Sequence, residues 1–295
     1  MTARRTGRTV AVTGASGYLG SRIGARFAAA GWRVLRLVRT PQPGAEDERA
    51  YQLAGPCPPG LLDSVDALVH AAYDLRLTRR EDIWRVNVEG TRRLLAAATA
   101  EGVGRVVVLS SMSAYPGTRQ LYGQAKLAIE EAALATGAVV LRPGLVYGAD
   151  PGGTAGALRR LTRLPLLPLI SPDAVQFPVH EDEVGAAVVA AATVERAPAG
   201  PVGVAAPAAV PFSRVLEMLA AAEGRRCRFL PIPVPWQLAL GAIRAAELLR
   251  LPLPFRSDSI LGLVRPAASV PGAEELSRLG VQIGGFGWTT APDPR

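Results

Sequence analysis

The chain has very little lysine, asparagine, cysteine and histidine. Its 295 residues include one lysine, Lys126, and one asparagine, Asn87, while 32 of its 33 basic residues are arginines. Together with abundant Ala, Gly and Pro, this skew is typical of a GC-rich coding bias. Under such a bias, a lysine or asparagine that persists marks a position where its chemistry is needed.

The same scarcity excludes several classes of protein. Cys57 and Cys227 lie far apart and, with only two histidines, offer no metal-ligand spacing, so we expect reduced thiols and no metal site. No apolar run reaches the roughly 18 residues of a membrane span, and the basic N-terminus lacks a signal-peptide core. The sequence therefore predicts a soluble, cytoplasmic protein.

A formal net charge of +8 raises the question of nucleic-acid binding. The arginines are scattered, however, and no basic stretch is interleaved with aromatic residues. There is also no helix-turn-helix pattern or zinc-finger spacing. We therefore expect no nucleic-acid partner.

Short apolar runs alternate with helical patterns through the first half of the chain, which predicts an α/β fold with a doubly wound parallel sheet, the Rossmann fold. Strands are expected at 9–13, 32–38, near 51–53, 66–70, 105–111 and 138–143, and helices at 18–30, 82–100 and 120–136. We predict a nucleotide-binding core over 1–148 and a small C-terminal substrate-binding lobe over 149–295, interleaved with the core because helix 181–194 packs back on the sheet.

A glycine-rich turn joins the first strand to its helix in the sequence TGASGYLG. Gly14 permits a tight turn, Gly17 a close approach of the backbone to a pyrophosphate, and Gly20 close packing of helix on sheet. With Ser16, Tyr18 and Leu19, these glycines are predicted to bind a dinucleotide.

The end of the second strand indicates which dinucleotide. An NAD site typically has a carboxylate there for the ribose 2′-hydroxyl, but this strand ends in Leu37, Val38 and Arg39. A guanidinium suits the 2′-phosphate of NADP, and Arg39 is better placed than Arg36, which lies within the strand. NADP is therefore the predicted cofactor, with NAD as the alternative.

Tyr122 and Lys126 lie four residues apart in a predicted helix, so they share one face. The ammonium group is expected to lower the pKa of the phenol, which is near 10 in water and otherwise too high for a base. A hydroxyl from Ser111, at the end of the preceding strand, is placed to hold a substrate oxygen, with Ser113 as its competitor.

These motifs occur in the order typical of the extended short-chain dehydrogenases/reductases, which include the NAD-dependent epimerases and dehydratases, and the chain resembles that family over roughly residues 9–190. Further motifs are DALVHAA, NVEGT, LSSMSAYPG, LRPGLVYG and FPVHEDEV. The resemblance implies that Ser111 orients the substrate, Tyr122 is the general acid/base and Lys126 also holds the nicotinamide ribose. It implies further that Asn87 braces the cofactor and the active-site helix, and that Ala71, Ala72 and Tyr73 line the cofactor. It assigns structural roles to His70 and His180.

The resemblance also bears on the reaction. Leu145 stands where nucleotide-sugar enzymes of the family usually have asparagine, and Met112-Ser113 replaces the Asp-Glu pair of the dehydratases. We therefore expect hydride transfer between nicotinamide and a ketone or secondary alcohol. Arg159, Arg160 and Arg163 keep nucleotide-sugar epimerisation as the alternative, because they offer contacts to a diphosphate. A non-catalytic cofactor sensor is the lesser alternative, and the family also suggests a homodimer.

Overall fold

The computed structural model describes residues 7–149, 153–164, 166–169, 174–231, 236–249 and 257–286. Its centre is a seven-stranded sheet in which every neighbouring pair is parallel. The strand order is β11 (Val202–Val204), β6 (Val139–Pro143), β5 (Arg105–Leu109), β4 (Ala67–His70), β1 (Thr9–Thr13), β2 (Arg33–Val38) and β3 (Glu48–Ala50). This topology confirms the predicted doubly wound fold.

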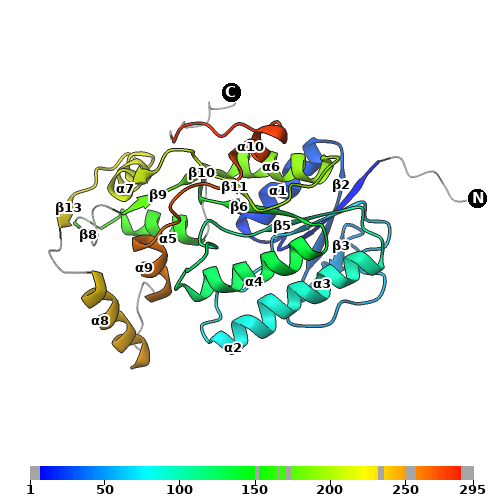
Figure 1. Ribbon diagram of the computed structural model, residues 1–295, viewed down its shortest axis with the longest axis horizontal. Helices are drawn as coiled ribbons and strands as arrows, with labels where there is room; N and C mark the ends of the chain where they lie inside the picture. Colours follow the sequence, from blue (N-terminus) through cyan, green and yellow to red (C-terminus); the bar gives the residue numbers. More distant parts are fainter. Residues whose placement is uncertain are drawn as a thin grey trace, which may run out of the picture.

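The central strands are buried and mostly apolar because helices cover both faces of the sheet. Figure 1 shows one layer of helices above the sheet and a second layer below it. The upper helices are α1 (Tyr18–Ala29), α6 (Glu181–Thr193) and α10 (Ala273–Arg278), and the lower ones are α2 (Arg80–Ile83), α3 (Glu89–Ala100) and α4 (Leu121–Ala135). Fully buried Ile23 and Phe27 pack in the upper core, and Leu95 and Ile129 in the lower one.

The remaining elements form smaller pieces beyond the carboxyl ends of the strands. The strand pairs are β7 (Leu145–Tyr147) with β10 (Pro178–His180), β8 (Leu167–Leu169) with β13 (Phe229–Pro231), and β9 (Val175–Gln176) with β12 (Val210–Pro211). The helices are α5 (Gly153–Leu161), α7 (Phe212–Ala221), α8 (Trp236–Leu248) and α9 (Ser257–Val264). Leu158, Phe212 and Leu216 give the contact between α5 and α7 an apolar core of its own.

Two elements differ from the predictions. The strand expected near 51–53 lies at Glu48–Ala50, and Tyr51 follows it with a hydrogen bond from its N–H to the carbonyl of Val38, at 2.8 Å. The helix expected over 82–100 is interrupted by a π-helical turn, Trp84–Val88, which contains Asn87. Such turns widen the backbone locally and often occur at functional sites. Of the three prolines that follow α5, Pro168 lies in β8, whereas Pro165 and Pro172 lie outside the described residues.

Candidate active site

The glycine turn forms a cradle at the start of α1. Gly14 has a φ of +67°, and a Cβ on it would lie 3.0 Å from the backbone nitrogen of Ala72. A Cβ on Gly20 would lie 2.1 Å from the carbonyl oxygen of Gly14, which is too close for any side chain. Gly17 precedes α1, and no side chain caps this helix, so its first N–H groups can receive an anion. The residues present therefore fit the diphosphate of a dinucleotide.

The other predicted cofactor residues surround this cradle. Ser16 is exposed, whereas Tyr18 and Leu19 are half-buried in the first turn of α1. The backbone N–H groups of Ala71 and Ala72 donate to the Thr13 hydroxyl, each at 3.1 Å. That contact places the segment after β4 directly beside Gly14.

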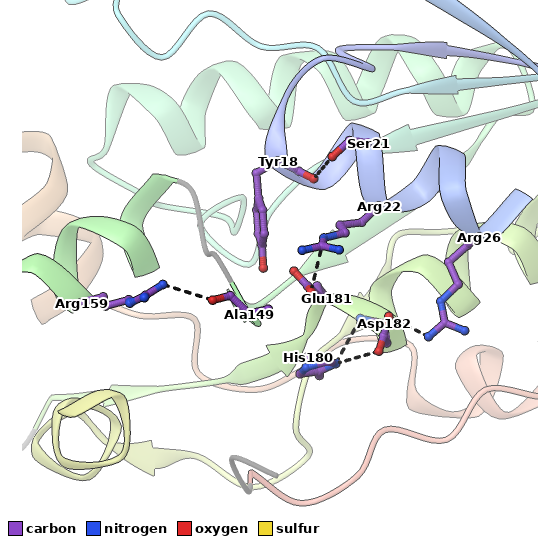
Figure 2. A network of polar contacts seen from close by, with 9 residues as sticks. All are labelled: Tyr18, Ser21, Arg22, Arg26, Ala149, Arg159, His180, Glu181 and Asp182. Atoms are coloured by element: carbon purple, nitrogen blue, oxygen red, sulfur yellow. Dashed lines mark hydrogen bonds and ion pairs between the residues drawn. The ribbon is translucent and has the colours of Figure 1, made fainter. Parts of the chain in front are cut away.

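Helix α1 is also tied to α6 by ion pairs along its length (Figure 2). Arg22 Nε lies 3.4 Å from a carboxylate oxygen of Glu181, and Arg26 pairs with Asp182 at 2.7 Å. His180 caps α6 through two hydrogen bonds. Its ring nitrogen Nδ1 accepts from the backbone N–H of Asp182, and its backbone N–H donates to the side-chain carboxylate of Glu183. His180 thus orients the helix that packs against α1.

His70 lies in a buried hydrogen-bonded chain. The Thr91 hydroxyl donates to the carbonyl of Asn87 at 2.7 Å, so it accepts from His70 Nε2, 2.8 Å away. Nδ1 then accepts from the Thr13 hydroxyl, at 2.8 Å. Burial, and secondarily the charge of Lys126, lowers the pKa of His70 to about 3. The imidazole is therefore a neutral brace that joins β1, β4 and α3.

This arrangement predicts a loss of stability in acid. The unfolded chain protonates His70 below about pH 6.5, but the folded chain does not until about pH 3, so the free energy of unfolding falls as pH falls through that window. Between about pH 6.5 and 5 the loss should reach about 2 kcal/mol. Urea unfolding at both pH values measures it in the native chain and in His70→Gln. An equal pH dependence in the two proteins would contradict the assignment.

Tyr122, Lys126 and Ser111 meet where β5 ends and α4 begins. Burial raises the pKa of Tyr122 to about 12, and a hydrogen bond with Ser111 acts in the opposite direction. Lys126 is 5% exposed and donates to the carbonyl of Leu109 at 2.7 Å. Burial lowers its pKa to about 8, against the opposing charge of Glu130.

The expectation that Lys126 lowers the pKa of Tyr122 is wrong for this structure. The Lys126 ammonium lies 5.8 Å from the centre of the Tyr122 ring and 4.8 Å from that of Tyr73. At this position the removal of the phenol from water raises its pKa, and the hydrogen bond with Ser111, not the charge of Lys126, acts against this effect. Tyr122 therefore keeps its proton near neutral pH.

Three contributions to this centre were not expected from the sequence. The Tyr73 ring, predicted only as backbone lining, packs edge-to-face on Tyr122 with 5.0 Å between ring centres. Glu130 accepts from Ser110 and from Arg142 on β6, with Arg142 Nε at 2.8 Å, and so anchors the strand end beside Ser111. Glu130 follows Lys126 by four residues, a spacing that places both side chains on the same face of α4. The third is Asp258 of α9, which accepts from the first N–H groups of α4.

Asn87 and Ser113 support the site from its edges. Asn87 is fully buried, and its side chain accepts from the N–H of Asp74 at 2.7 Å, which fixes the segment after β4. The Ser113 N–H donates to the Ser111 hydroxyl at 3.1 Å. The hydroxyl that hydrogen-bonds Tyr122 is therefore that of Ser111.

The arginines have different surroundings. Arg36 pairs with Glu48 at 2.7 Å, whereas Arg39 is exposed and forms no ion pair with any residue that the structure describes. Glu223, which follows α7, binds Arg159 of α5 at 2.5 Å and also contacts Arg163 at 3.5 Å. Both are thereby engaged by a carboxylate, which weakens the expectation that they contact a diphosphate.

The described residues offer neither a metal site nor a membrane span. No cluster of three or more His, Cys, Asp or Glu side chains there could hold a metal ion. None of the described helices is both long and apolar enough to cross a membrane. Cys57 and Cys227 are both free thiols.

Residues 10–164 match the model of the NAD dependent epimerase/dehydratase family. The chain belongs to this family. It is 31% identical over 190 residues to the ceramide reductase of Caulobacter vibrioides, with 61% of this chain and 60% of that protein covered. It is 30% identical over 197 residues to a dTDP-4-dehydro-6-deoxy-D-allose reductase of a Streptomyces species, with 52% and 60% covered. The chain thus spans about 60% of the length of these relatives.

The fold has counterparts among solved structures. MoeE5 in complex with UDP-glucuronic acid and NAD matches with a TM-score of 0.72 and 23% identity, covering 94% of both chains. At this identity the likeness establishes the fold. The family and this fold confirm the predicted membership of the extended short-chain dehydrogenases/reductases.

Proposed function

We propose that the chain is an NADPH-dependent reductase of a carbonyl compound, with Tyr122 as the proton donor. The observation that carries this proposal is the placement of the Tyr122 phenol, hydrogen-bonded to Ser111 and lying on the same helix as Lys126. A phenol that keeps its proton at neutral pH can donate it to a carbonyl oxygen as hydride reaches the carbon, because the alkoxide that would otherwise form is a much stronger base than the phenolate.

Each residue of the site has its own role in the proposed carbonyl reduction. Reduced nicotinamide, when bound, supplies a hydride to the carbonyl carbon. Ser111 holds the carbonyl oxygen, and Tyr122 transfers its phenolic proton to that oxygen as the carbonyl π electrons move onto it. Lys126, one helical turn from Tyr122, would hold the nicotinamide ribose, and Gly14, Gly17 and the first N–H groups of α1 would hold the diphosphate.

Similarity supports reduction, and the lobe favours an apolar substrate. The relatives from Caulobacter and Streptomyces are both named as reductases, one of a lipid and one of a nucleotide sugar. Because Glu223 engages Arg159 and Arg163, the lobe offers fewer free cations to a nucleotide diphosphate than its sequence suggested. We therefore infer a hydrophobic ketone as the substrate class.

Nucleotide-sugar epimerisation is the second candidate, because MoeE5 was solved with a UDP-sugar and NAD. NADPH oxidation against acyl-chain ketones and dTDP-4-keto sugars separates the candidates. Net oxidation with the acyl-chain ketones supports the proposal. An altered nucleotide sugar with no net change in cofactor would establish epimerisation instead.

The preference for NADPH is tested at Arg39. Arg39 forms no ion pair with the described residues, so it can bind a phosphate without first breaking one. Arg36 would have to break its ion pair with Glu48. Arg39→Gln should weaken NADPH binding by about tenfold to a hundredfold, the loss of one or two charge-assisted hydrogen bonds, and leave NADH binding nearly unchanged.

Fluorescence titration of NADPH and NADH measures these affinities. The matched control is Arg36→Gln, which lies within β2, the strand that Arg39 follows. If Arg39→Gln weakens NADPH and NADH equally, the 2′-phosphate is not bound there.

A further inference from the structure

The catalytic helix α4 begins without a cap from its own sequence. Gln120 precedes it and makes no side-chain capping bond, and the first turn contains no acidic residue. The first four N–H groups of any helix lack partners within the helix. In α4 these groups include the backbone N–H of Tyr122. A group that accepts a hydrogen bond from this N–H therefore also fixes the position of the Tyr122 side chain.

A carboxylate from the C-terminal lobe satisfies two of these groups. Asp258, in the first turn of α9, accepts from the Leu121 N–H at 2.8 Å through one oxygen and from the Tyr122 N–H at 3.3 Å through the other. An anion at this end of a helix is also favoured by the helix dipole. Figure 1 shows α9 beside the end of α4 where the helix begins.

Two other contacts lock α9 against the same segment. Gln120 Nε2 donates to the Asp258 carbonyl at 2.7 Å, and the Tyr115 hydroxyl donates to the Arg265 carbonyl at 2.7 Å. Helix α9 approaches Gln120 closely at Gly262, because a Cβ on Gly262 would lie 2.2 Å from Gln120 Nε2. The glycine thus allows α9 to sit directly on the start of the catalytic helix.

We propose that Asp258 is a positioning residue for the reaction: it caps α4 from the lobe and thereby sets the place of Tyr122. This inference rests on the proposed role of Tyr122 as proton donor. Asp258 touches the backbone of Tyr122 and not its phenol, so the expected effect is on turnover and not on cofactor binding.

The test compares Asp258→Ala, Asp258→Asn and, as a matched control, Glu274→Ala, which removes an exposed carboxylate from the first turn of α10. We expect Asp258→Ala to lower kcat about tenfold or more, with the cofactor Kd unchanged. Asparagine caps helices nearly as well as aspartate, so Asp258→Asn should restore most of the loss. Glu274→Ala should behave as the native chain.

Hydrogen exchange gives a readout independent of activity. The Leu121 and Tyr122 amides should exchange faster in Asp258→Ala and at the native rate in Glu274→Ala. Unchanged exchange, or faster exchange with native kcat, would overturn the inference and leave the proposed function standing. Full activity in Tyr122→Phe would instead overturn the proposed function, whatever the exchange shows.

Discussion

Replacing Tyr122 with phenylalanine should lower kcat/KM for carbonyl reduction by about a thousandfold, within the range by which a positioned proton donor accelerates a reaction. The substitution removes one oxygen atom and leaves the ring packed against Tyr73. NADPH binding should persist, because the glycine cradle is untouched. Steady-state kinetics and cofactor titration on the same preparation measure both quantities.

The matched control is Tyr73→Phe. The Tyr73 hydroxyl is buried and has no hydrogen-bond partner among the residues described, while its ring contacts both Tyr122 and Lys126. Removal of this hydroxyl alone should therefore change kcat only slightly. If the two variants lose activity to the same extent, the loss cannot be assigned to the Tyr122 proton.

Gly20→Ala should abolish dinucleotide binding and destabilise the fold. The new Cβ would lie 2.1 Å from the Gly14 carbonyl oxygen, which is backbone and cannot swing away as a side chain would. Either α1 moves away from the sheet or the turn opens, and both changes destroy the cradle. We expect a loss of several kcal/mol in the free energy of unfolding, as for other overpacked sites, and no measurable NADPH binding.

Gly24→Ala on the same helix provides the control. Its Cβ would lie 3.6 Å from a methyl group of Val34, an ordinary contact. Alanine is favoured over glycine inside a helix by about 1 kcal/mol, so this variant should bind cofactor normally and be as stable as the native chain or more so. Native-like cofactor binding by Gly20→Ala would show that the turn is not the diphosphate site.

The fold could be predicted because its signals are local. The runs at 9–13 and 66–70 have apolar centres, as buried parallel strands require, and the glycine turn follows the first of them directly. The strand at Glu48–Ala50 was misplaced because it is short and polar. The π-helical turn at Asn87 was missed because the helical pattern continues on both sides of it.

The candidate site could be predicted only where its residues share a motif. Tyr122 and Lys126 lie one turn apart on a helix, so their spacing alone places them together. Asp258 carries no comparable signal, because its contact with Tyr122 joins positions 136 residues apart through the packing of α9. The direction of the Tyr122 pKa shift was also beyond the sequence, since it depends on how deeply the phenol and the ammonium are buried.

Transfer of deuterium tests the proposed chemistry most directly. The native chain is incubated with NADPH deuterated at the reactive C4 position and with an acyl-chain ketone, and the alcohol is examined by mass spectrometry. We expect one deuterium on the former carbonyl carbon for each NADP formed, and almost none with Tyr122→Phe under the same conditions. Formation of the alcohol without deuterium, or at an undiminished rate in Tyr122→Phe, would contradict hydride transfer with Tyr122 as the proton donor.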